Sequence, residues 1–126
     1  MVQLGYGVES RMQDNEYKFS DHGVKVAVTI SSAARDSGST PTTTLRKGLV
    51  LGKVTATGKY KEYSNAANDG TETAAGILDA ETNLLDGAGA AADSQATMLI
   101  HGFVSESKLH GIDANGKSDL KAIIFG

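Results

Sequence analysis

The sequence predicts a mainly β domain (β-rich α+β), a small sandwich or barrel-like body of short strands with one or two helical turns and an extended N-terminal arm. Three observations lead to this fold class. The chain has 126 residues, which suffices for one domain with a modest core. It contains 15 glycines and a single proline. Its apolar residues fall in short runs between turn-forming residues, a pattern typical of turn-dense β folds rather than helical bundles.

Residues 1–44 are expected to form an N-terminal arm and a flexible linker. Within them, residues 24–30 alternate between apolar and more polar side chains, which predicts an edge or half-buried strand. Residues 31–44 contain few side chains that could pack and carry the only proline, so they are expected to be mobile. The strand could therefore pair with another protein or belong to the domain's own sheet, and both possibilities stay open here.

The β-rich domain is expected over residues 45–126. Residues 45–56 are apolar on both faces of an extended chain, which predicts an interior strand. A turn at 68–70, built from Asn, Asp and Gly, separates a short aromatic strand at 60–63 from another strand at 74–78.

The last part of the chain predicts a loop, two strands and a helical turn. Residues 82–93 are mostly small and are expected to form a loop. Residues 95–104 are again apolar on both faces and predict a second interior strand. One helical turn is expected at 118–121, with Ser118 as its N-cap, before a final strand at 122–125.

Four short motifs carry a family resemblance. They are residues 46–52 (RKGLVLG), 58–60 (GKY), 69–70 (DG) and 75–78 (AGIL), followed by an apolar strand at 96–104. Their order and spacing resemble the head decoration proteins of tailed bacteriophages, the lambda-type capsid-cementing family. The resemblance covers roughly residues 45–126.

The resemblance implies a non-enzymatic protein of the virion. Members of the family form homotrimers on the outer surface of the phage head, contact the major capsid protein and stabilise the expanded shell. The protein would then assemble in the cytoplasm of the bacterial host and reside on the capsid exterior. The family's N-terminal arm engages the capsid, and the alternating apolar row of the expected arm is the candidate contact: Val24, Val26, Val28 and Ile30.

A candidate trimer interface follows from the surplus of apolar side chains on short strands. A chain of this length is not expected to cover all of them by itself, and exposed apolar patches commonly mark interfaces. The residues proposed for this interface are Leu49, Leu51, Leu99, Phe103 and Ile124.

The sequence offers no chemistry for an enzyme. It has no cysteine, which excludes a disulfide framework and a thiolate nucleophile. The three histidines lack carboxylates at metal-ligand spacing, and no Gly-x-Ser-x-Gly motif is present. No catalytic residue, metal site or cofactor is therefore expected.

Charge and hydropathy narrow the range of partners. The net charge of −3 provides no basic stripe for nucleic acid. No apolar run reaches membrane-spanning length, and the first residues lack the basic start of a signal peptide. Neither direct nucleic-acid binding nor a membrane partner is expected. The alternative function is a small β-barrel binding module for one protein partner or a small ligand.

Overall fold

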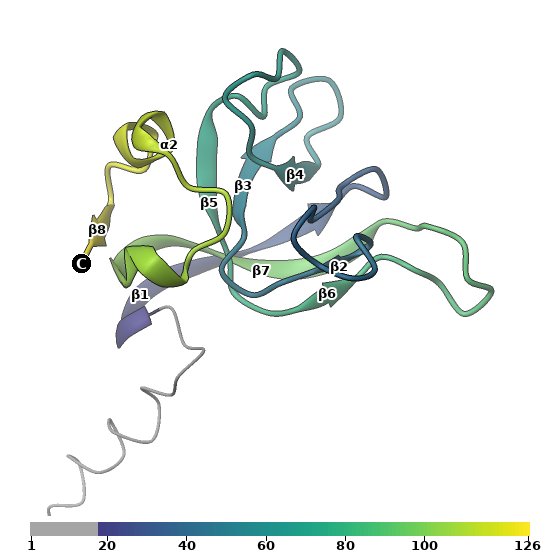
Figure 1. Ribbon diagram of the computed structural model, residues 1–126, viewed down its shortest axis with the longest axis horizontal. Helices are drawn as coiled ribbons and strands as arrows, with labels where there is room; N and C mark the ends of the chain where they lie inside the picture. The colour runs from purple at the N-terminus through teal and green to yellow at the C-terminus, as the bar shows by residue number, and fades with distance from the viewer. Residues whose placement is uncertain (1–17) are drawn as a thin grey trace, which may run out of the picture.

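Two long antiparallel strands organise the structure, a computed structural model that describes residues 18–126 (Figure 1). Strand β1 (Lys18–Ile30) and strand β7 (Ser94–Val104) pair from Ile30 opposite Ser94 to Lys18 opposite Val104. Their apolar residues recur with the two-residue period of a strand, which lets one row face the core.

A closed barrel forms around one half of this long pair. The other barrel strands are β3 (Val50–Lys53), β4 (Tyr60–Glu62) and β5 (Ala74–Leu78). The strands pair in the order β1, β4, β3, β5 and β7, and the pairing of β7 with β1 closes the ring. Closure removes most exposed strand edges from this half of the molecule. The mainly β fold class predicted from the sequence is confirmed.

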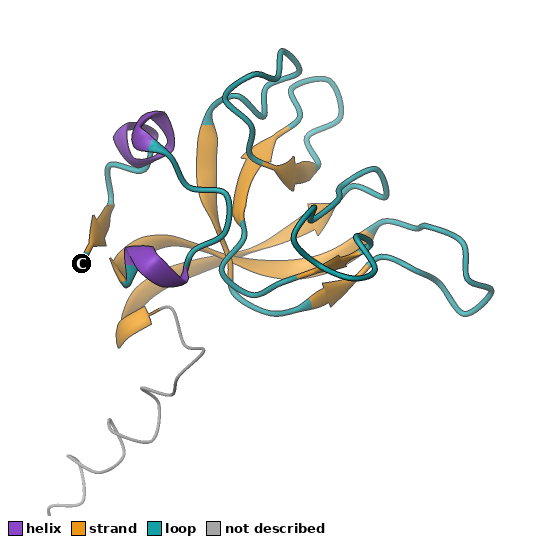
Figure 2. Cartoon of the chain, in the orientation of Figure 1, coloured by secondary structure: helices purple, strands orange, loops and turns teal. Residues whose placement is uncertain are grey.

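Shorter elements decorate the barrel (Figure 2). Strands β2 (Thr44–Leu45) and β6 (Thr82–Asn83) form a separate two-stranded sheet. The 3-10 helix η1 (Glu106–Lys108) and the helix α2 (Ala114–Asp119) precede strand β8 (Ile123–Phe125). Strand β8 pairs in parallel with the end of β7, so the last residues lie beside the long strand pair.

The core contains branched aliphatic side chains from every barrel strand except β4. Each such side chain contributes about 1.5–3 kcal/mol when fully removed from water. The branched aliphatic side chains with no or almost no exposed surface are Ile30, Leu45, Val50, Leu51, Ile77, Leu78, Leu84, Leu99 and Val104.

Close backbone packing occurs at two strand glycines. A Cβ placed on Gly52 would lie 2.6 Å from the Thr71 Cα and 2.8 Å from its carbonyl oxygen. A Cβ on Gly76 would lie 2.7 Å from the Met98 sulfur and 2.8 Å from the Leu99 carbonyl oxygen. Neither position leaves room for a side chain, so the strands approach closely there.

The expected separation of an arm at residues 1–44 from a domain at 45–126 is wrong for residues 18–44. Residues 24–30 form part of β1 and pair with β7 of the same chain. Ile30 and Ala34 have no exposed surface and pack in the same cluster as Leu45. The strand belongs to the domain's own sheet because its apolar row completes the barrel core. The remaining part of the expected arm, residues 1–17, lies outside the described residues.

The flexible linker expected at residues 31–44 is instead a packed loop around a buried carboxylate. The Asp36 side chain is 2% exposed and accepts hydrogen bonds from the Arg46 side chain, the Arg46 backbone N–H and the Gly38 N–H. Burial acts to raise the pKa of Asp36, but these hydrogen bonds outweigh it and hold the pKa below its usual value. The low apolar content of residues 31–44 did not predict this packing, because hydrogen bonds to the buried Asp36 carboxylate, rather than apolar contacts, hold the loop in place.

Two other elements differ from their expected bounds. The single strand expected at 45–56 is divided, because the chain turns at 46–49 between β2 and β3 and again after Lys53. The helical turn begins at Ala114 rather than at Ser118. Its N-cap is Asp113, whose carboxylate accepts the Gly116 N–H at 2.7 Å and the Tyr63 hydroxyl at 2.7 Å. A capping carboxylate can stabilise a short helix that weak propensity alone would not predict.

Candidate interaction surfaces

The ends of β1 and β7 extend beyond the barrel and form a ribbon with β8 (Figure 2). The described pairings of β5 with β7 are at Met98 and Leu99, and that of β4 with β1 is at Ile30. Past these points, β7 lies between β1 on one side and β8 on the other. One face of this ribbon packs on the segment that carries η1 and α2, where Val104 and Ile123 are buried, and the opposite face is left accessible to another molecule.

A β-bulge in β7 changes which side chains the ribbon exposes. Val24 lies opposite His101, whereas the next residue, Lys25, lies opposite Leu99, so Ile100 is the extra residue. An extra residue shifts the in–out alternation by one position. As a result Leu99 is fully buried while Phe103, which would share its face in a regular strand, is 41% exposed.

Three exposed apolar side chains lie close together on this ribbon. Phe103 is directly opposite Ile124 in the β7–β8 pairing, and Val24 is opposite His101, two residues before Phe103. Directly paired residues project from the same face of a sheet. Val24 is 49% exposed and Ile124 is 55% exposed. We call Val24, Phe103 and Ile124 the ribbon patch.

The residues proposed from the sequence for a trimer interface do not form one surface. Leu49, Leu51 and Leu99 are at most 4% exposed and belong to the core of the subunit. Buried side chains cannot contact a second molecule while the subunit stays folded. Phe103 and Ile124 do come together, in the ribbon patch.

The residues proposed for a capsid-binding arm are also divided. Val28 and Ile30 face the barrel core, and Val26 is half-buried against it. Because their strand is already paired with β7, adding this row to a sheet of another protein would require the barrel to open. Val24 alone of the four lies in the ribbon patch.

A second exposed feature is the hairpin between β6 and β7, residues 85–91, which projects at the end of the molecule opposite β8 (Figure 1). Leu85 bridges Ala91 at its base and is 38% exposed. The Asp86 carboxylate accepts the N–H groups of Ala88 and Ala90 at 2.8 and 3.0 Å. The loop predicted at 82–93 is correct for this segment but not for Thr82–Asn83, which form β6. Nothing in the composition of the loop signals its projection.

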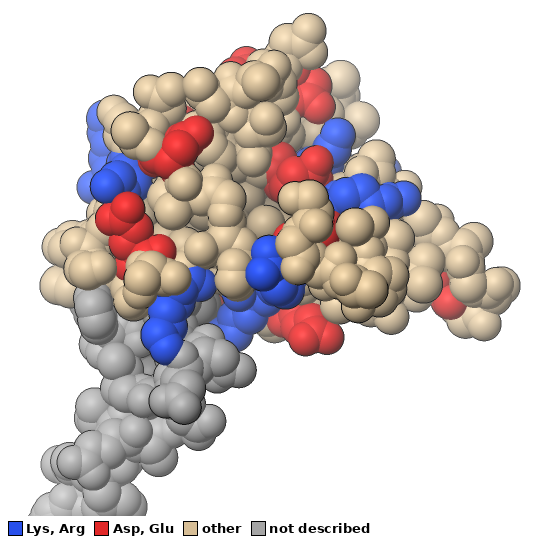
Figure 3. Space-filling model, in the orientation of Figure 1, with Lys and Arg blue, Asp and Glu red and all other residues tan. Residues whose placement is uncertain are grey.

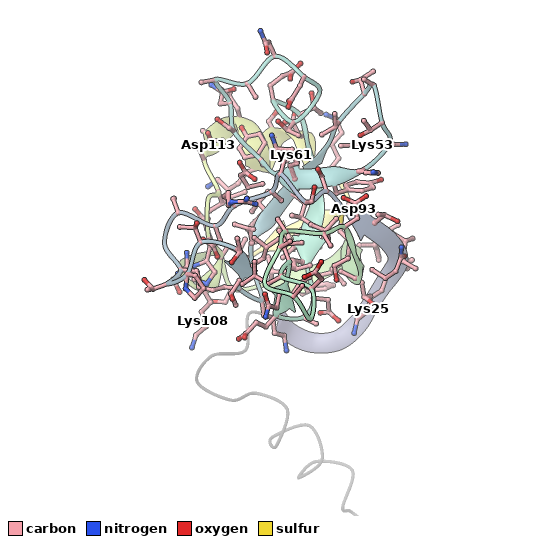
Figure 4. All side chains as sticks on the ribbon, turned by 90° about the vertical axis from the view of Figure 1, so that its right-hand side faces the viewer. Lys25, Lys53, Lys61, Asp93, Lys108 and Asp113 are labelled. Carbon is pink, nitrogen blue, oxygen red and sulfur yellow. The ribbon has the colours of Figure 1, made fainter. Side chains whose placement is uncertain are left out.

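Charged side chains form pairs of opposite sign rather than a single-sign field. Lys25 pairs with Asp79 at 2.8 Å, and Lys117 pairs with Glu106 at 3.2 Å. Asp93 binds the Lys59 ammonium and accepts the Ser32 N–H. On the face in Figure 3, acidic and basic residues are interspersed. In Figure 4, Lys53 lies near the top of the molecule and Lys25 near the bottom, so these two lysines do not form one basic cluster. Such a surface favours contacts between proteins over binding to a polyanion.

The described residues contain no group of three or more His, Asp or Glu side chains placed to hold a metal ion. Within the same part of the chain, no helix is long and apolar enough to cross a membrane. His110 is half-buried, and its pKa is lowered first by burial and then by the nearby Arg46 charge. Among the described residues, the candidate sites for contact with another protein are the ribbon patch and the 85–91 hairpin.

Comparison with known proteins gives one match. The model of the family described as bacteriophage lambda head decoration protein D matches residues 9–123, which is most of the chain. No curated protein matches the chain significantly. The matched region includes every barrel strand, the hairpin and the first residue of β8.

Proposed function

This chain belongs to the family of bacteriophage lambda head decoration protein D, and we infer that it binds the outer surface of a tailed-phage head as a homotrimer and stabilises the expanded shell. The observation that carries this function is the family match over residues 9–123. The family implies a structural role on the phage capsid. Trimer formation and shell stabilisation are the further steps of the proposal.

The exposed apolar surface supports assembly with other proteins. The ribbon patch places three large apolar side chains on one face, and exposed patches of this kind commonly mark protein–protein interfaces. Burying side chains that are about half exposed recovers only part of the 1.5–3 kcal/mol available for each, so one patch would hold weakly. Repeating the contact around a trimer, and then on a capsid, makes later attachments intramolecular and raises the overall avidity.

We assign the capsid contact to the first 17 residues, the part of the expected arm that precedes β1. The described chain starts at Lys18, which lies opposite Val104 at the end of the ribbon. The C-terminal Gly126 also lies there, because its N–H donates to the Val104 carbonyl. Lys18 and Gly126 thus lie at the same end of the described structure, so one side of a trimer would carry the points from which all three N-terminal segments extend.

The alternative of a barrel that carries a small ligand has less support. Leu51, Leu78 and Met98 are at most 2% exposed and pack in one core cluster with Val28 and Ile30. Barrel diameter grows with strand number, and an interior just wide enough for side chains is reached at about eight strands, so this five-stranded ring is narrower still. A ligand inside it would have to displace them.

The proposed function is tested by mixing the purified protein with undecorated, expanded heads of the phage that encodes it. We expect saturable binding, with added density of threefold symmetry on the outer surface in electron microscopy. Decorated heads should withstand a higher temperature before rupture than bare heads. Light scattering of the free protein should give three times the chain mass of 13.1 kDa. Failure to bind expanded heads at micromolar concentration would refute the capsid role.

A further inference from the structure

We propose that the 85–91 hairpin of each copy docks on the ribbon patch of the next copy, so that one contact repeated three times closes the ring. This inference rests on the homotrimer of the proposed function and names its interface. A cyclic trimer requires a heterologous contact, in which one surface of a subunit meets a different surface of its neighbour. The chain must therefore present two distinct and complementary surfaces.

The exposed apolar residues are distributed over two such surfaces. Among residues 23–126, whose side chains are described, the large exposed apolar side chains are Val24, Leu85, Phe103 and Ile124. Three of them form the ribbon patch, and Leu85 lies at the base of the hairpin. The hairpin and β8 are at opposite ends of the longest axis of the molecule (Figure 1). One subunit cannot bring its own two surfaces together, but neighbours in a ring can.

The hairpin is organised before it meets a partner. The Asp86 N–H donates to the Ala90 carbonyl at 2.8 Å, and the Ala92 N–H donates to the Leu84 carbonyl at 2.7 Å. The Asp86 carboxylate binds two further N–H groups of the tip. Docking a segment whose polar groups are already paired requires little additional ordering or desolvation.

The hairpin tip is narrow and is not supported by the rest of its own subunit. Every residue from 85 to 91 is exposed. A Cβ added at Gly87 or Gly89 would have no atom within 4 Å. A projection made of Gly and Ala can approach a flat apolar surface closely, with Leu85 at its base available to contact Ile124 or Val24 of the neighbouring copy.

The charges of the two surfaces are complementary. Asp86 is the only charged residue of the hairpin. At the β8 end of the ribbon, Lys121 is exposed, its ammonium donates to the Ser118 carbonyl, and the carbonyl of the next residue accepts the Gly102 N–H. Opposite charges at the edge of an apolar contact steer the encounter and fix its orientation. These charges favour a second copy of this chain as the occupant of the patch.

Two single substitutions test the contact. Leu85→Asp alters the hairpin, and Ile124→Asp alters the patch; Val24→Asp serves as a second patch variant should Ile124→Asp fail to fold by circular dichroism. Each folded variant alone should be a monomer by light scattering, because every interface of its ring would contain one altered surface. Ala66→Asp, at an exposed position outside both surfaces, is the matched control and should remain a trimer.

A mixing experiment then distinguishes this contact from others. The hairpin variant keeps an intact patch, and the patch variant keeps an intact hairpin. An equimolar mixture should therefore form a dimer with one copy of each variant. Because a single contact holds this dimer, it should form only at a higher concentration than the wild-type trimer, and native mass spectrometry across a concentration series, with one variant isotopically labelled, detects it. A contact between two identical surfaces would not be restored by mixing.

The outcomes separate this inference from the proposed function. Monomeric single variants that form the mixed dimer would support the inference. Single variants that stay trimeric, or monomeric variants that do not associate on mixing, would overturn the inference and leave a trimeric wild-type protein intact as a cement. A wild-type protein that is monomeric both in solution and on heads would overturn the homotrimer and this inference together.

Discussion

The Arg46 guanidinium donates two hydrogen bonds to the Asp36 carboxylate, from Nε to Oδ2 at 2.8 Å and from Nη2 to Oδ1 at 2.9 Å. Asp36 is almost fully buried, whereas the Arg46 side chain is 37% exposed. The pair joins the loop after β1 to the residue after β2, and so holds a segment with few apolar side chains against the barrel.

Removing the arginine should destabilise the fold. In Arg46→Leu, the Asp36 carboxylate would stay buried without its charged partner, which costs about 1–3 kcal/mol for lost hydrogen bonds to a charged group. Partial exposure of Arg46 places the expected loss toward the lower end of that range. Urea unfolding measures the loss, with Lys53→Leu as an exposed control. A midpoint equal to that of the wild type would show that the pair does not hold the loop.

Stability should fall as the pH drops below 6.5, in part because of His110. Burial and the Arg46 charge lower the pKa of folded His110 below its ordinary value of 6.5. The unfolded chain therefore binds the proton first, and stability is lost between pH 6.5 and the lower folded pKa. His110→Gln should give a smaller difference in unfolding free energy between pH 7.5 and pH 5 than the wild type, and Thr57→Ala should keep the wild-type difference. An unchanged difference in His110→Gln would contradict this account.

Adding one methyl group at Gly52 should be more harmful than adding one at Gly87. The Gly52 methyl would meet the Thr71 backbone at 2.6 Å. Gly52 is held between Lys61 and Ala74 by strand pairing, and the Thr71 carbonyl is held by the Ser64 N–H, so neither can move aside without breaking hydrogen bonds. Overpacking of this kind costs about 1–3 kcal/mol. Gly87→Ala places its methyl in open space and is the matched control. Thermal unfolding should separate the two variants by several degrees, and equal melting temperatures would argue against this packing.

Two N-terminal truncations should behave differently. Deleting residues 1–17 leaves β1 and all described core residues in place, so the shortened chain should fold and form trimers but lose binding to heads. Deleting residues 1–40 also removes β1, including Val28 and Ile30, and should unfold the barrel. Circular dichroism and co-sedimentation with expanded heads check both expectations. Full binding by the first truncation would place the capsid contact on the described body of the protein.

Individual strands were largely predictable from local sequence. The alternation at 24–30, the small residues at 74–78 and the double-faced apolar run at 95–104 all lie within observed strands. These signals act over a few residues, because a strand needs only its own side-chain period and a turn at each end. The Asp36–Arg46 pair was not predictable, since its partners are ten positions apart and no local pattern links them.

The sequence by itself determined the β class, the approximate places of the main strands and the resemblance to decoration proteins. Only the tertiary structure decided which apolar faces are internal. Leu99 and Phe103 are four residues apart and would face the same side of a regular strand. A single bulge between them buries Leu99 and exposes Phe103. Apolar side chains on one face of a strand are stable when another surface buries them, but their sequence does not indicate whether that surface belongs to the same chain or to another. That choice depends on strand pairings between residues far apart in the chain, and here they place β1 in the barrel and leave the ribbon patch exposed.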